Sequence, residues 1–122
     1  MIGRWIIGII GAITLAYGVA GFAFPADLGE SLGVGAHSAL GLSELRALYG
    51  GVLGTLGIVL LAALRFPGGG HWTRVVAAIH AGAAISRVTS VALGGMDGAI
   101  IFAACYETIV ALALFKASSS LD

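Results

Sequence analysis

Four apolar runs, each of about twenty residues, follow one another along this chain of 122 residues. A helix rises about 1.5 Å per residue, so a run of that length can cross a hydrocarbon core about 30 Å thick. Inside lipid the backbone finds no water to bond, which leaves helices as the structure available to such runs. The sequence therefore predicts an all-α integral membrane four-helix bundle in a single domain, residues 1–122, with spans at about 5–24, 43–64, 72–93 and 98–115.

The composition agrees with a membrane protein. Apolar residues make up 59% of the chain and charged ones 10%, against about 25% charged residues in an average soluble domain. Six basic and six acidic residues cancel, so no overall charge favours nucleic acid as a partner. The lone Cys105 excludes an intrachain disulfide. We interpret the first run as a retained helix, because its apolar core is long for a signal peptide.

Basic and acidic residues fall on opposite sides of a chain that crosses four times. The basic residues are Arg4, Arg65, Arg74 and Lys116, and the acidic ones are Asp27, Glu30 and Asp97. Cytoplasmic loops of membrane proteins carry an excess of Lys and Arg, which predicts that both termini are cytoplasmic. Trp5 and Trp72 lie at the same boundary, where indole rings favour the headgroup zone.

The connection between the first two spans is longer than the other two. Pro25 is suited to start a short helix that continues to Leu32, and Gly33 is suited to end it. We expect this helix to lie on the outer surface, either as a lid over the bundle or as a simple tether. Ser43 is expected to cap the N-terminus of the second span.

Two opposite charges lie deep inside apolar runs. Arg87 lies ten residues before Asp97 and Glu107 ten residues after it. If Asp97 marks the turn of a helical hairpin, both charges lie about 15 Å below that turn, near the middle of the membrane. Charge at that depth is costly and usually functional.

Neighbouring residues indicate that both charges face other helices. Thr73, His80, Arg87 and Gly94 recur every seven residues and form one stripe, with Ala77 and Ala84 between them. Small residues also surround Glu107 on its own face, as expected where one membrane helix meets another; they are Ala103, Ala104 and Ala111.

The second span adds further polar residues. Arg46 and Tyr49 share a stripe with Gly50 and Gly57, whereas Glu44 lies on the opposite side of the helix. No metal or cofactor site follows, because His80 and Cys105 are too few ligands, and no catalytic residue is assigned. The candidate ligand-binding residues are Arg46, Tyr49, His80, Arg87, Glu107 and Glu44.

Three interpretations of Arg87 and Glu107 stay open: a structural ion pair, part of a cavity for a ligand with a polar head and an apolar body, or a proton route through Glu107. The leading functional prediction is a membrane protein, more a binding protein than an enzyme, that holds a lipid-like, isoprenoid-like or quinone-like molecule. A partner subunit could occupy the same residues, and the chain could form a homo-oligomer or be a subunit of a membrane complex. The alternatives are a small proton-coupled transporter working as a dimer, and a membrane enzyme acting on an isoprenoid or sterol-like substrate with Glu107 or His80 as acid or base.

The octapeptide from Glu44 to Gly51, ELRALYGG, resembles the entry to the second helix of a bacterial four-helix membrane family of unknown function, DoxX-like in style. The step Ser86-Arg87 and the run from Cys105 to Glu107 extend the resemblance. It implies a four-helix bundle, an arginine and a glutamate at these two positions, and a bacterial inner membrane location. DoxX-like relatives include subunits associated with quinone-linked oxidoreductases, which implies a quinone or isoprenoid ligand.

Overall fold

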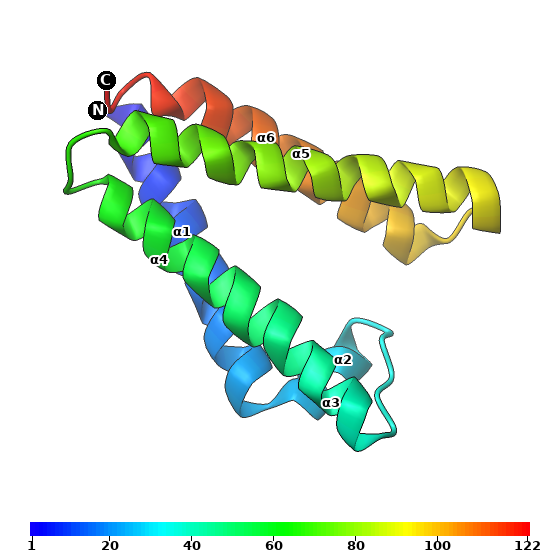
Figure 1. Ribbon diagram of the computed structural model, residues 1–122. Helices are drawn as coiled ribbons and strands as arrows, with labels where there is room; N and C mark the ends of the chain where they lie inside the picture. The colour runs from blue at the N-terminus through cyan, green and yellow to red at the C-terminus, as the bar shows by residue number, and fades with distance from the viewer. The chain divides into compact units, whose positions relative to one another are not determined.

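The computed structural model describes all residues from Met1 to Asp122, and every regular element in it is a helix (Figure 1). In chain order the elements are α1 (Ile2–Ala23), α2 (Pro25–Ser31), α3 (Ala39–Leu45), the π-helix η1 (Arg46–Leu53), α4 (Gly54–Ala63), α5 (Gly69–Gly94) and α6 (Gly98–Ser118). Four helical stretches are long and apolar enough to cross a membrane: Ile2–Ala23, Ala39–Ala63, Gly69–Gly94 and Gly98–Ser118. The predicted all-α fold with four spans is confirmed.

The chain divides into two compact units. Residues 1–7 and 63–122 form the first unit, and residues 8–62 form the second. Helix α1 therefore begins in the first unit and continues in the second. The assembly of the four spans into one bundle, and into one domain, stays a prediction.

A hairpin of α5 and α6 dominates the first unit, and the two helices run side by side in Figure 1. Gly95 has φ +96°, a left-handed conformation that suits glycine and ends α5. Asp97 then caps α6, since its carboxylate accepts hydrogen bonds from the backbone N–H of Ala99 at 2.7 Å and of Ile100 at 3.4 Å. Asp97, which is expected in the turn, is thus also the N-cap residue of the last span.

The face that α5 and α6 share is built mostly from small residues. Their spacing of three and four residues is that of helices packed along a common seam, and small residues let membrane helices approach closely. The buried residues of α5 are Gly69, Gly70, Thr73, Val76, Ala77, His80 and Ala84, and those of α6 are Ala104, Val110, Ala111, Leu114, Ala117 and Ser118. The predicted inward stripe of α5 is confirmed from Thr73 to Ala84.

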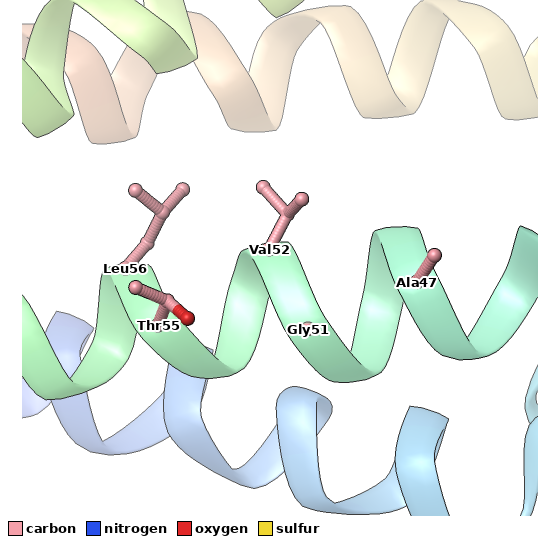
Figure 2. Close-up of a pocket in the computed structure, with 5 residues that line it drawn as sticks. All are labelled: Ala47, Gly51, Val52, Thr55 and Leu56. Carbon is pink, nitrogen blue, oxygen red and sulfur yellow. The ribbon is translucent and has the colours of Figure 1, made fainter.

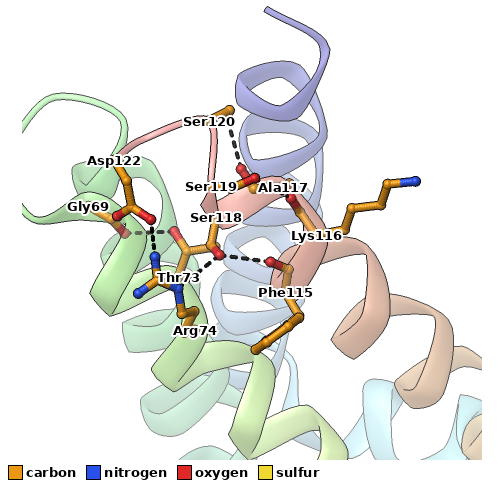
Figure 3. A network of polar contacts seen from close by, with 10 residues as sticks. All are labelled: Gly69, Thr73, Arg74, Phe115, Lys116, Ala117, Ser118, Ser119, Ser120 and Asp122. Carbon is orange, nitrogen blue, oxygen red and sulfur yellow. Dashed lines mark hydrogen bonds and ion pairs between the residues drawn. The ribbon is translucent and has the colours of Figure 1, made fainter.

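A polar network fixes the end of the first unit that is opposite the Asp97 turn (Figure 3). Arg74 donates from Nε to Ser118 Oγ at 3.2 Å and forms an ion pair with Asp122. The Arg4 guanidinium donates to the carbonyl oxygen of Leu64. These bonds tie the start of α1 to Leu64, which precedes α5, and tie α5 to the end of α6 and to Asp122.

Glycines bring α1 against η1 and α4 in the second unit. A Cβ atom added to Gly18 would lie 2.3 Å from the Cα of Gly54, and one added to Gly57 would lie 2.5 Å from the backbone nitrogen of Leu15. Such distances leave no room for a side chain, so the backbones are in direct contact. The predicted close-packing face of the second span is confirmed.

The short helix between the first two spans is present as expected. Helix α2 begins at Pro25 and ends at Ser31, and Gly33 follows with φ +70°. It packs on α3, since a Cβ added to Gly29 would lie 2.6 Å from Leu45 Cδ1. Whether α2 acts as a lid or as a tether stays open.

One predicted helix cap is wrong. The second span begins at Ala39 rather than near Ser43, because Ser38 has extended backbone angles and its Oγ accepts from the N–H of Gly41 at 3.0 Å. Ser43 lies inside α3 and caps nothing. Helix α5 begins at Gly69, three residues before the predicted span, and Gly68, with φ +78°, makes the turn before it.

The π-helix η1 was not expected. Its hydrogen bonds join residues five apart, so each turn is wider than in an α-helix and residues four apart no longer lie one above the other. It covers Arg46–Leu53 and therefore most of the ELRALYGG octapeptide. π-Helices are rare overall, and those that do occur often lie at functional sites.

Candidate functional site

The polar residues of the α5–α6 hairpin lie near the middle of their helices. Glu107 is the tenth of the 21 residues of α6, and His80 is the twelfth of the 26 residues of α5. Helices of these lengths span about the thickness of a hydrocarbon core. Both side chains therefore belong to the deepest part of the predicted membrane region.

Glu107 lies between His80 and Arg87 and contacts both. Its Oε2 forms a hydrogen bond with His80 Nδ1, and its Oε1 lies 3.9 Å from Arg87 Nη2. The side chains of His80 and Glu107 are 5% and 14% exposed, whereas that of Arg87 is 38% exposed. We call these three residues the mid-helix polar group. Histidine is the nearer partner of the carboxylate, and arginine approaches it only loosely.

Two nitrogen atoms of the mid-helix polar group have no hydrogen-bond partner although they are buried. They are His80 Nε2 and Arg87 Nε. An ionised Glu107 only accepts hydrogen bonds, so the proton of a neutral His80 lies on Nδ1 and its Nε2 becomes an acceptor. Arg87 Nε–H is always a donor. With Glu107 ionised and His80 neutral, the group offers one unused acceptor and one unused donor.

The expected pair of Arg87 and Glu107 is present, but the sequence reasoning missed the closer contact with His80. The sequence prediction centres the hairpin turn on Asp97, whereas α5 ends at Gly94 and α6 begins at Gly98. The midpoint of the turn between the two helices is therefore one residue earlier than Asp97. Glu107 then lies at the same height along the hairpin as the part of α5 between His80 and Arg87. The stripe that joins those two residues was the signal that could have shown this.

A hollow of about 230 Å³ lies against the hairpin beside this group. It is lined by Ala81, Ala84, Ile85, Thr108, Ala111 and Leu112. Thr108 is the only lining residue with a polar side chain, and its hydroxyl donates to the carbonyl oxygen of Ala104 at 2.8 Å. The hollow is therefore suited to hydrocarbon rather than to a polar group.

The other candidate residues lie in the second unit. Tyr49 is half-buried on η1, and a Cβ added to Gly21 of α1 would lie 2.5 Å from Tyr49 Cβ. Arg46 and Glu44 are both exposed. Arg46 therefore does not lie on the buried glycine face that it was expected to share, whose Gly54 and Gly57 are buried. A single cluster that includes residues of both units stays a prediction.

A second hollow, of about 380 Å³, lies along η1 and α4 (Figure 2). It is lined by Ala47, Gly51, Val52, Thr55 and Leu56, all from η1 and α4. Thr55 has the only polar side chain among them. This surface is apolar and shallow, with chemistry that suits a hydrocarbon chain.

The structure holds no group of three or more His, Cys, Asp and Glu side chains that could bind a metal ion. His80 and Glu107 together can hold or pass a proton, and with Arg87 they can hydrogen-bond a polar head. The arrangement therefore combines polar recognition at mid-helix with apolar surroundings.

One protein family matches nearly the whole chain. The model described as Domain of unknown function (DUF4345) covers residues 2–117. The chain belongs to this family. No curated protein and no solved structure matches this DUF4345 chain. The expected family of unknown function with four apolar helices is confirmed, and its DoxX-like character stays a prediction.

Proposed function

We propose that this DUF4345 protein is an integral protein of the bacterial inner membrane that binds a lipid-like molecule of the isoprenoid or quinone type. The polar head of the molecule would lie at the mid-helix polar group and its apolar body along the helices. The observation that carries the proposal is the unused hydrogen-bonding capacity of His80 Nε2 and Arg87 Nε at the middle of the hairpin. A partner subunit that offers the same chemistry is the alternative occupant.

The charges of the group favour a neutral polar head. The carboxylate of Glu107 and the guanidinium of Arg87 cancel when His80 is neutral, so a charged head would leave a net charge deep in the membrane. Each buried polar atom without a partner costs about 1–3 kcal/mol. A hydroxyl or carbonyl group that reaches these atoms would recover part of that cost.

Residues of the second unit supply the other proposed contacts. Tyr49, Arg46 and Glu44 are the residues of that unit that we propose for ligand binding. Their part in binding rests on the expected bundle and on the ELRALYGG octapeptide. The DoxX-like resemblance is the reason to consider a quinone first.

A photoreactive isoprenoid alcohol that carries a diazirine tests the proposal. The probe is added to the purified protein in detergent, irradiated, and located by mass spectrometry of the peptides. We expect labelling between His80 and Arg87 or next to Glu107. Glu107→Gln and Arg87→Gln should each reduce this labelling at least several-fold, whereas Ser90→Ala, which removes an exposed hydroxyl one turn further along α5, should not.

Labelling spread evenly over all four spans would contradict the proposal, as would equal labelling of wild type and Glu107→Gln. Excess unlabelled isoprenoid alcohol must also reduce the signal, because a binding site saturates. Circular dichroism of each variant separates loss of binding from loss of helical structure.

A second function is favoured by the hydrogen bond between His80 and Glu107. Carboxylate and histidine side chains in contact at mid-membrane form proton relays in pumps and transporters. The second candidate is therefore a small proton-coupled transporter, working as a dimer. Proteoliposomes that contain a pH-sensitive dye should then show proton entry that His80→Gln abolishes, and no entry above that of empty vesicles would contradict it.

A further inference from the structure

Exposed aromatic residues and basic residues gather at the end of the first unit that is opposite the Asp97 turn. Three of the basic residues directly adjoin an aromatic residue in the chain: Arg4 with Trp5, Arg65 with Phe66, and Lys116 with Phe115. The aromatic side chains are 70%, 68% and 65% exposed, in that order. We call these six residues, together with Trp72 and Arg74, the basic end.

Contacts within the first unit place the basic end in one region. Arg4 bonds to the carbonyl oxygen of Leu64, directly before Arg65. Arg74 bonds to Ser118 and to Asp122, just after Lys116. The proximity of α1 to the residues after α6 follows from Gly3, because a Cβ added there would lie 2.5 Å from Ser120 Oγ.

Two of the four cations have no partner in the structure. Arg4 and Arg74 are held by the bonds just described, whereas the side chains of Arg65 and Lys116 are exposed and make no hydrogen bond or ion pair. Figure 3 shows the Lys116 side chain extending away from the polar network. Asp122 is the only acidic side chain in this region, and it is already paired with Arg74. The basic end therefore has a surplus of positive charge.

We propose that the basic end binds phospholipids with a net negative headgroup, with Arg65 and Lys116 as the residues that contact the phosphate. Aromatic side chains lie at headgroup depth in membrane proteins, where their rings are half in hydrocarbon and half in water. Each exposed aromatic residue thus places the neighbouring cation at the level of the phosphates. Basic clusters at the ends of membrane helices attract anionic lipid in this way.

The two tryptophans of the chain, Trp5 and Trp72, both belong to the basic end and report on the lipid next to it. The protein is reconstituted into phosphatidylcholine with an increasing share of brominated phosphatidylglycerol, and tryptophan quenching is measured. Brominated phosphatidylcholine with the same chains gives the reference. We expect phosphatidylglycerol to quench at lower mole fraction than phosphatidylcholine, and high salt to reduce the difference.

The variant R65Q/K116Q should lose most of this preference, because each removed cation should lower the affinity for phosphatidylglycerol relative to phosphatidylcholine about fivefold. The matched variant R65K/K116R keeps both charges and should keep the preference. Because neither side chain has a partner, both variants should retain wild-type helicity, which circular dichroism checks. Equal quenching by the two lipids in wild type, or an unchanged preference in R65Q/K116Q, would overturn the proposal.

Inorganic phosphate distinguishes a lipid site from a site for the free ion. Phosphate and chloride at equal ionic strength should reduce the phosphatidylglycerol preference equally, because both act only by screening. A specific displacement by phosphate at low concentration would assign the residues to a soluble anion and overturn the lipid proposal.

Discussion

The contact of Glu107 with His80 should contribute more to stability than its contact with Arg87. A double-mutant cycle tests this with the substitutions Glu107→Leu, His80→Leu and Arg87→Leu and the two double variants that contain Glu107→Leu. Each single substitution strands a buried partner, whereas each double substitution removes a pair. The coupling energy of each pair is the quantity that the cycle isolates.

The geometry sets the expected magnitudes. His80 and Glu107 are in hydrogen-bond contact, with side chains 5% and 14% exposed. Hydrogen bonds to charged groups contribute about 1.5–3 kcal/mol in soluble proteins, and cycles in a membrane protein reach at most about 1.7 kcal/mol. We therefore expect a coupling of about 1.5 kcal/mol. Arg87 lies 3.9 Å from the carboxylate and is 38% exposed, so its coupling should be about 0.5 kcal/mol or less.

Reversible unfolding by sodium dodecyl sulfate in mixed micelles, followed by circular dichroism, gives the unfolding free energy of each variant. Glu107→Leu alone should be the least stable single variant, and His80→Leu with Glu107→Leu should recover part of the loss. A coupling of Glu107 with Arg87 equal to or larger than that with His80 would refute the assignment of histidine as the main partner.

Four further substitutions, at three positions, test the packing and the capping, all by the same unfolding measurement. Gly57→Ala should destabilise by about 1–3 kcal/mol, because its Cβ would lie 2.5 Å from the backbone of Leu15; wild-type stability would contradict the close approach. Gly82→Ala is the matched control, since no atom lies within 4 Å of its Cβ, and a better helix former should leave stability unchanged or raised by up to about 1 kcal/mol. Asp97→Ala should lower the unfolding free energy by about 1 kcal/mol because the N-cap is lost, whereas Asp97→Asn should keep most of the stability that the cap provides. Equal stability of the two variants would contradict the cap.

Hydropathy alone was sufficient to predict the four spans, because a single apolar run of about twenty residues satisfies its own backbone in lipid as a helix. It could not locate the helix ends, which depend on local backbone angles. Ser38 and Ser43 are equally suitable caps by residue type, and only Ser38 is extended in the structure. The three glycines after Pro67 are likewise equally suited by residue type to the turn before α5, and only Gly68 adopts the left-handed backbone conformation.

The candidate site was predictable in its residue types but not in its pairing. Repeats of seven residues placed His80 and Arg87 on the inward face of α5, and the small residues near Glu107 placed it on the facing side of α6. Centring the turn on residue 96 instead of Asp97 places Glu107 level with residue 85, which is still nearer in sequence to Arg87 than to His80. The contact with His80 therefore depends on side-chain direction and reach, which residue spacing alone does not give. The π-helix leaves no clear sequence signal, because the residues from Arg46 to Leu53 suit an α-helix equally well by composition.

Native mass spectrometry of the protein released directly from its own membrane tests the proposed binding function most directly. Wild type should carry a hydrophobic molecule in addition to the mass of the polypeptide, and the double variant Arg87→Leu/Glu107→Leu, which removes both charges of the group, should lose it. The same spectrum reports whether the protein is a dimer. The same bound mass on both proteins, or none on wild type, would contradict the binding of a ligand at the mid-helix polar group.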